Sequence, residues 1–153
     1  MDEIECIARG GLFHGSKVLL CQNLKHGYFY LPGGHIDFNE SAAAALAREF
    51  LEETGLTVRV HDLVLASEGA FDTKKRRHHE INLVFHVERA SKTASSSSGS
   101  PPTVKSREEH ISFAWIDLAA APDMDIRPVA AKAWLAAGGQ SASGAEWVSE
   151  FNG

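Results

Sequence analysis

The most constraining feature of this sequence is an alanine-rich segment, residues 34–56, that predicts one helix with a dense acidic face. Asn39 is a suitable N-cap, and Glu40 would follow it in the first turn, where a carboxylate favours the positive end of the helix dipole. Gly55 can adopt the left-handed conformation that ends many helices. The sequence therefore predicts a helix that begins close to Asn39 and ends at Gly55.

Three carboxylates and one guanidinium gather on this predicted helix. Glu49, Glu52 and Glu53 are spaced at i, i+3 and i+4, and Arg48 can pair with Glu52 one turn later. Like charges at this spacing destabilise an isolated helix by about 0.2–0.5 kcal/mol per pair, which a bound cation would remove. Because the ligands are all oxygens, Mg²⁺ or Mn²⁺ is the expected ion, and such ions often join carboxylates to substrate phosphates. On charge pattern alone, the alternative is a solvated acidic helix face.

The residues around the helix resemble the Nudix family. Leu31, Pro32 and two glycines precede the helix and predict a tight backbone turn that a ligand can approach closely. The whole segment fits the Nudix box, G-x(5)-E-x(7)-R-E-U-x-E-E-x-G-U, in which U is aliphatic or aromatic. The matching residues are Gly34, Glu40, Arg48, Glu49, Phe50, Glu52, Glu53, Gly55 and Leu56. Flanking features resemble MutT-type members, so the resemblance runs from residue 4 to residue 136.

This resemblance implies an α/β fold, namely an α/β/α sandwich with a mixed β-sheet between helices. It also implies a hydrolase of acid anhydrides that uses Mg²⁺ or Mn²⁺ to cleave the diphosphate of a nucleoside diphosphate linked to another group, X. We favour a nucleoside triphosphate as the substrate, because markers of other subgroups, such as a proline soon after the box, are absent. Ile126 stands where the oxidised-guanine prototype reads its base with asparagine, which argues against 8-oxo-dGTP. The alternatives are an ADP-ribose or nucleotide-sugar hydrolase and a non-catalytic nucleotide-binding module.

The resemblance also implies a role for each matching residue. Glu52 and Glu53 are expected as metal ligands, Glu49 as a ligand or general base, and the Gly33 carbonyl as a further ligand. Arg48 should hold a neighbouring glutamate in place, and Glu40 should support the helix start. A downstream ligand is expected from the loop before the last strand, at Glu109 or its neighbour Glu108. The candidate substrate contacts are Arg9, Gly34, Tyr28 and Phe71.

The length of 153 residues, 44% of them hydrophobic, predicts one domain with its own core. We place this domain at residues 1–137, with a Ser/Pro-rich surface loop at 90–106 and a C-terminal linker and tail at 138–153 that Trp147, Val148 and Phe151 could dock. Besides the acidic helix, a second helix is expected at residues 127–136. Hydrophobic periodicity predicts strands at residues 3–13, 16–22, 28–31, 57–60, 63–68, 79–89 and 111–116.

Charge and composition restrict the partners. The net charge of −5 argues against a nucleic-acid polymer as partner. It is compatible with a small nucleotide substrate that binds through a metal ion. No apolar run is long enough for a membrane span and the N-terminus is acidic, so we expect a cytoplasmic protein without membrane contact; a homodimer is left open. Cys6 and Cys21 are expected as buried free thiols. The basic run at 74–77 and the pair His78–His79 are expected on exposed surface.

Overall fold

The computed structural model describes residues 2–90, 99–140 and 144–151. Its elements follow in the order β1 (Ile4–His14), β2 (Lys17–Asn23), β3 (Phe29–Tyr30), β4 (Gly33–His35), α1 (Ala42–Thr54), β5 (Val58–Asp72), β6 (Arg77–Arg89), β7 (Ile111–Asp117), η1 (Leu118–Asp123), α2 (Val129–Ala136) and β8 (Glu146–Ser149). Part of the predicted loop at 90–106, and part of the predicted tail, fall outside the described residues.

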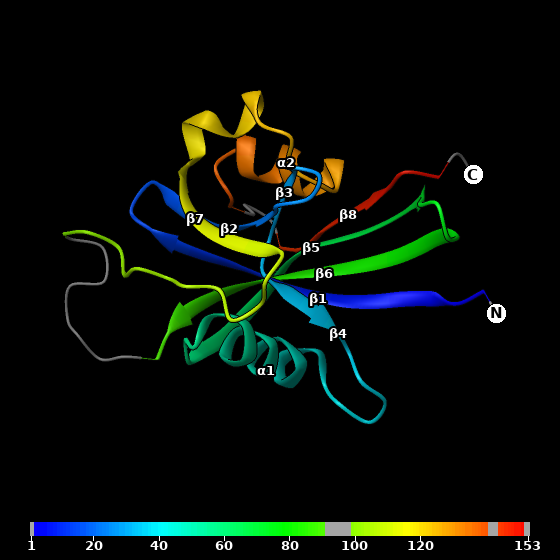
Figure 1. Cartoon of the computed structure of the whole chain (residues 1–153), viewed down its shortest axis with the longest axis horizontal. Coiled ribbons are helices and arrows are strands. Elements are labelled where there is room, and N and C mark those ends of the chain that lie inside the picture. The colour runs from blue at the N-terminus through cyan, green and yellow to red at the C-terminus, as the bar shows by residue number, and fades with distance from the viewer. Residues whose placement is uncertain (1, 91–98, 141–143, 152–153) are drawn as a thin grey trace.

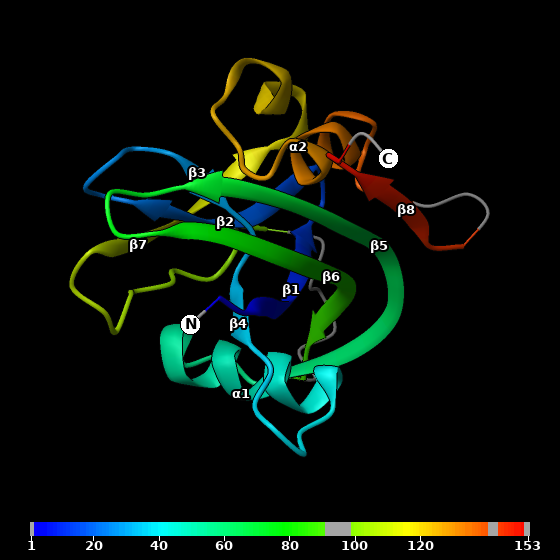
Figure 2. The same ribbon diagram turned by 90° about the vertical axis from the view of Figure 1, so that its right-hand side faces the viewer.

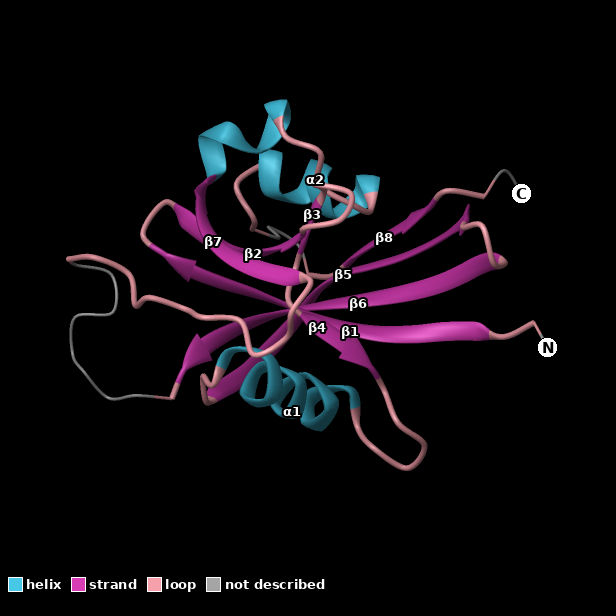
Figure 3. Cartoon of the chain, in the orientation of Figure 1, coloured by secondary structure: helices cyan, strands magenta, loops and turns pink. Residues whose placement is uncertain are grey.

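One mixed sheet carries the fold. Its main path is β3-β2-β1-β6-β5-β8, with β4 added to β1 and β7 added to β2. β1 is parallel to β6 and β5 is parallel to β8, whereas β5 and β6 form a long antiparallel pair. Helix α1 covers one side of the sheet, and α2 with η1 covers the other (Figures 1 and 3). The predicted α/β/α arrangement is therefore confirmed.

The two helical layers each cover a separate apolar core. Strand β2 supplies both, because successive side chains of a strand point to opposite faces, and Leu19 and Leu20 enter different clusters. Leu19 packs in the cluster that contains Phe50 of α1, and Leu20 in the cluster that contains Trp134 of α2. Gly10 lets α1 approach β1 closely, since a Cβ there would lie 2.6 Å from the Phe50 ring. The core thus fixes α1, and its glutamates, against the sheet.

The start of the acidic helix differs from the prediction. Ser41 is the N-cap, since its Oγ accepts a hydrogen bond from Ala44 N at 3.1 Å. The assignment of Asn39 as N-cap is wrong; this residue takes a left-handed φ of 65° in the preceding turn. Glu40 consequently lies before the helix and not in its first turn. The predicted end is confirmed, because Gly55 is the left-handed C-cap with a φ of 76°.

Two further expectations need correction. The separate strands predicted at 57–60 and 63–68 form one strand, β5, whose register with β6 shifts between Val60 and Leu65 as the strand curves (Figure 2). Cys6 is exposed, so only Cys21 is the buried thiol that was predicted. The predicted terminal element does dock: β8 pairs with β5 and Val148 packs on the α2-side core, although Trp147 is 59% exposed. Among the described residues, no helix is long and apolar enough to span a membrane.

Candidate active site

The candidate site begins where β4 meets α1. The sequence predicts a tight turn at residues 31–34, but the two glycines lie in a strand, in which Gly33 pairs with Arg9 and Gly34 with Ala8 of β1. A Cβ on Gly34 would come within 2.7–2.8 Å of the Glu49 carboxylate oxygens. Gly33 has a φ of 148°, and a Cβ there would overlap the Ala8 carbonyl. The glycines are therefore needed for space, because strand, helix and carboxylate meet at them.

Arg48 is held by hydrogen-bond acceptors that lie before the helix and within it. Its Nε and Nη2 donate to Glu40 Oε2 and Oε1 at 2.8 and 2.9 Å, and Nη1 donates to Glu49 Oε1 at 3.0 Å. Nη1 also reaches Glu52 Oε2 at 3.4 Å, which is the pair expected from the spacing, and Nη2 reaches the His35 carbonyl at 3.3 Å. The Arg48 guanidinium, together with a backbone hydrogen bond from Asp37, lowers the pKa of Glu40 to about 2. Arg48 thus fixes the orientation of Glu49 while Glu40 fixes Arg48.

The three helix glutamates differ in burial and in pairing: Glu49 accepts a hydrogen bond from Arg48 at 3.0 Å, and Glu53 is the most buried of them. Glu53 is only 9% exposed, and its burial, followed by the negative charges of Glu49 and Glu108, raises its pKa to about 8. Glu52 differs, because its side chain is 57% exposed and turns toward Arg48. The three glutamates that spacing placed on one face are therefore a buried one, Glu53, a half-buried one, Glu49, and an exposed one, Glu52.

The pair of Glu49 and Glu53 suits a hard divalent cation. Two carboxylates in a buried site repel each other, and a cation of the Mg²⁺ type takes one or two carboxylates and leaves its other positions to water and phosphate oxygens. Within the described residues, no three His, Cys, Asp or Glu side chains gather closely enough to form a complete metal site by themselves. Of the two downstream candidates, it is Glu108 whose charge acts on Glu53, and no such effect of Glu109 is seen. The carboxylates therefore fit a metal ion whose remaining ligands include phosphate oxygens of the substrate.

A cleft of about 690 Å³ opens beside the glutamate pair. It lies on β1, β4, β5 and β6 and is bordered by the segment before α2. The predicted residues that line it are Arg9, Tyr28, Gly33, Gly34, Glu49, Glu53 and Phe71, whereas Arg48, Glu52 and Glu109 do not. Sequence reasoning missed Ser67, Asn82, Arg127, Lys132 and Glu150. Asn82 is 4% exposed and shares a face of β6 with the buried Val84, and nothing local to the sequence marks Glu150.

Two arginines stand over aromatic rings in this cleft. The Arg127 guanidinium lies 4.4 Å from the Tyr28 ring centroid, and Asp125 accepts two hydrogen bonds from it, each 3.0 Å long. Arg9 lies 5.3 Å from the Tyr30 ring and donates to Asn82 Oδ1 at 3.3 Å and to a backbone carbonyl. Fixed cations beside aromatic surface suit a ligand that combines anionic groups with a planar ring.

Glu5, which is only 8% exposed, joins three side chains beside the cleft, one of which, His35, lines it. Its carboxylate contacts His35 at 2.7 Å, Arg76 at 2.6 Å and His78 at 2.8 Å, and these partners, His35 first, hold the Glu5 pKa below its ordinary value. His78 in turn stacks on Phe71, with ring centroids 4.7 Å apart. The expected exposure is confirmed for the basic run, although Arg76 also pairs with Glu5, whereas His78 is half-buried and not on exposed surface as expected.

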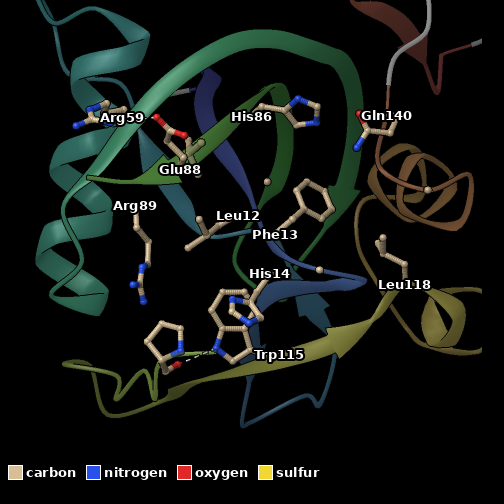
Figure 4. Close-up of a pocket in the computed structure, with 15 residues that line it drawn as sticks. Leu12, Phe13, His14, Arg59, His86, Glu88, Arg89, Trp115, Leu118 and Gln140 are labelled. Carbon is tan, nitrogen blue, oxygen red and sulfur yellow. Dashed lines mark hydrogen bonds and ion pairs between the residues drawn. The ribbon is translucent and has the colours of Figure 1, made fainter. Parts of the chain in front are cut away.

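A second pocket of about 500 Å³ lies on the later part of β1 and contains no predicted site residue (Figure 4). Figure 4 shows Arg59 and Glu88 together on one side of it and Gln140 on the other. Glu88 lies 3.2 Å from Arg59 and 3.1 Å from His61, and these partners, His61 first, lower its pKa. The Trp115 indole N–H is also satisfied, since it donates to the Pro102 carbonyl at 2.9 Å.

Comparison with known proteins gives concordant matches. The family model described as NUDIX domain matches residues 6–135. An ADP-ribose pyrophosphatase of Methanocaldococcus jannaschii is 36% identical over 75 residues, which are 46% of this chain and 42% of that relative. A Mycobacterium tuberculosis protein, provisionally named 8-oxo-dGTP diphosphatase 2, is 28% identical over 141 residues, or 86% of each chain.

Solved structures share the fold. The MutT protein from Methanosarcina mazei superposes with a TM-score of 0.65 at 22% identity, and the match covers 89% of this chain and 93% of that one. A NUDIX hydrolase from Nitrosomonas europaea gives a TM-score of 0.68 at 16% identity, covering 97% and 80%. At these identities the likeness establishes the arrangement of helices and strands.

Proposed function

The chain belongs to the Nudix family, and from that premise we propose that it is a Mg²⁺- or Mn²⁺-dependent pyrophosphohydrolase. It cleaves a diphosphate bond in a nucleoside diphosphate linked to a group X, and a nucleoside triphosphate is the substrate we favour. The observation that carries the proposal is the Glu49–Glu53 pair, which lines a cleft of about 690 Å³ and in which the charge of Arg9 only partly offsets the raised pKa of Glu53. An incompletely compensated carboxylate in a cleft is typical of a functional site.

The metal would be held by Glu53, by Glu49 or Glu52, and by the Gly33 carbonyl, with Glu108 or Glu109 as a downstream ligand. When bound, it supplies neutralisation of the diphosphate charge and a lowered pKa for an attacking water. The phosphates and the nucleoside would then meet the fixed cations Arg9 and Arg127 on the walls of the cleft.

The remaining chemistry belongs to the side chains of the helix. Glu49 is the candidate general base, because it lines the cleft and Arg48 holds one of its oxygens at 3.0 Å. That contact fixes the direction of the second Glu49 oxygen. Because the same guanidinium also pairs with Glu40, its positive charge is shared between the two carboxylates. Arg48 and Glu40 thus act as positioning residues.

ADP-ribose or a nucleotide sugar is the second candidate substrate, and the M. jannaschii relative named ADP-ribose pyrophosphatase favours it. A non-catalytic nucleotide-binding module is a weaker alternative, because such a module has no use for the intact set of box glutamates. The cytoplasmic location and a homodimer stay predictions from the sequence alone.

The test is product release from a panel of nucleoside triphosphates, ADP-ribose and nucleotide sugars, with Mg²⁺, with Mn²⁺ and with chelator. We expect metal-dependent release of phosphate or pyrophosphate products from at least one class of substrate, and loss of that release in Glu52→Gln and Glu53→Gln. Glu88→Gln is the matched control, since it neutralises a carboxylate in the other pocket. Absence of metal-dependent turnover across the panel, or full activity in both box variants, would sink the proposal.

A further inference from the structure

The segment after the family domain supplies part of the substrate cleft. β8 lies beyond the residues 6–135 that match the family model, yet it extends the sheet in parallel with β5 (Figures 1 and 2). The chain just after β8 is fixed to β5 by two hydrogen bonds, from Glu150 N to the Glu68 carbonyl at 3.0 Å and from Ser149 Oγ to Glu68 Oε1 at 2.9 Å. The next residue, Phe151, lies against His79, with ring centroids 4.9 Å apart.

These contacts direct the Glu150 carboxylate over Gly69, into the cleft. A Cβ on Gly69 would overlap this carboxylate, so the glycine leaves the space that the carboxylate occupies. Glu68 and Glu80, which also line the cleft, accept hydrogen bonds from Ser149 and Asn82. Within the described residues, the Glu150 carboxylate has no hydrogen-bond donor. It is therefore an acceptor available to a ligand.

The strand order places Glu150 far from the glutamate pair. Strand β4, which carries Gly33 and Gly34, is followed across the sheet by β1, β6, β5 and then β8. Neighbouring strands are about 4.8 Å apart, so three strands separate the two borders of the cleft. When a diphosphate lies beside Glu49 and Glu53, the group that reaches Glu150 is the other end of the substrate.

We propose that Glu150 is a specificity-determining residue of this cleft, which accepts hydrogen bonds from donor groups on the nucleoside part of the substrate. This inference rests on the proposed function. An ionised carboxylate only accepts hydrogen bonds, so it selects hydroxyl or amino groups and repels a further phosphate or carboxylate. The donors come from one of two sources, the ribose hydroxyls or an amino group of the base.

Full-length Glu150→Gln and Glu150→Ala variants test this inference against a matched control, Glu146→Gln. Glu146 is exposed at the start of β8, four residues before Glu150, and does not line the cleft. We compare kcat/KM for ATP with dATP, which differ in the ribose 2′-hydroxyl, and for ATP with ITP, which differ in the 6-amino group. If ADP-ribose is the better substrate, the same two changes are made within that molecule.

We expect Glu150→Ala to reduce one of these two ratios by about tenfold, since a hydrogen bond to a charged group is worth that much or more. A change confined to the ATP/dATP ratio identifies the ribose as the donor, and one confined to the ATP/ITP ratio identifies the base. Glu150→Gln, which keeps one acceptor oxygen and loses the charge, should change the same ratio by less. Thermal unfolding should match that of Glu146→Gln.

The inference is overturned if both Glu150 variants keep both ratios at the wild-type values. Measuring Kd for the same nucleotide pairs by calorimetry separates this inference from the proposed function. An inactive wild-type protein whose Kd ratios depend on Glu150 would contradict the hydrolase and retain the role of Glu150. Active protein whose ratios are unchanged in the Glu150 variants would support the hydrolase and contradict the role of Glu150.

Discussion

The two cavities of this protein lie on successive parts of β1 and differ in how their carboxylates are paired. In the cleft of about 690 Å³, burial and like charge raise the pKa of Glu53 to about 8. In the pocket of about 500 Å³, Arg59 and His61 lower the pKa of Glu88. The volumes are similar, so size does not identify the site. The site is identified instead by a carboxylate whose charge the fold does not fully compensate. Such a group lowers stability, so it is expected where a ligand will neutralise it.

The sharpest test of this comparison, and the largest expected effect, is Glu53→Gln. We expect kcat/KM to fall at least about 100-fold, or about 2.7 kcal/mol, if Glu53 binds the metal. A carboxyl whose pKa is raised on folding loses stability as the pH rises from its unfolded value, 4.5, to its folded value, about 8. At pH 7 without metal, the free energy of unfolding of Glu53→Gln should therefore exceed that of the wild type by about 1–3 kcal/mol, and the variant should unfold at a higher denaturant concentration.

Loss of stability in Glu53→Gln at pH 7 would contradict the incompletely compensated state of Glu53. Repeating the unfolding at pH 4 serves as the internal control, because both proteins then carry a neutral group and the difference between them should disappear.

Glu5 is the paired counterpart near the same cleft, and its removal should act in the opposite sense. Glu5→Ala leaves Arg76, His35 and His78 without their shared carboxylate, at a cost of about 1–2 kcal/mol in the free energy of unfolding. The cost is smaller than for a fully buried ion pair because the Arg76 and His35 side chains, 38% and 63% exposed, can turn to solvent. Urea unfolding measures the change, with Glu3→Ala as control, since Glu3 is exposed and lies 4.0 Å from Arg76. Equal changes in the free energy of unfolding for the two variants would contradict a stabilising role of the Glu5 contacts.

Glu40 gives a smaller effect with a defined pH dependence. Its pKa falls on folding from 4.5 to about 2, chiefly through Arg48, so the stability it contributes is full above pH 4.5 and is lost as the pH falls toward 2. The stability difference between wild type and Glu40→Gln should follow that course in thermal unfolding measured between pH 2 and pH 7. A difference that is constant over this range would contradict the ion pair.

The smallest effect is expected in the second pocket. Because Glu88 is an exposed partner of Arg59 and His61, Glu88→Gln should leave the free energy of unfolding close to the wild-type value. Its kcat/KM should stay within about twofold of the wild-type value, since random surface changes rarely affect distant chemistry. A large loss of activity would break the contrast between the cavities and assign a function to the second one.

How much of this could be predicted depends on sequence distance. The grouping of Glu49 and Glu53, the Arg48–Glu52 pair and the Gly55 cap follow from helix geometry, which acts over three or four residues. The start of the helix was misplaced because Asn39 and Ser41 are both good N-caps, and only the turn that puts Asn39 at positive φ decides between them.

Contacts between distant segments lie outside such reasoning. The partners of Glu5 are 30, 71 and 73 residues away along the chain, and Glu150 meets a cleft built from β1, β4, β5 and β6. Each depends on strand order and register, which a period-two pattern does not specify.

The position of β8 at the edge of the sheet has a consequence for motion. β8 is four residues long and bonds to the body of the sheet only through β5, whereas β5 and β6 pair along almost their whole length. Short edge elements open locally at a small fraction of the global unfolding free energy, so its amides should exchange with solvent deuterium well before those of β6. A nucleotide that binds Glu150, at the border of the cleft next to β8, should therefore slow that exchange.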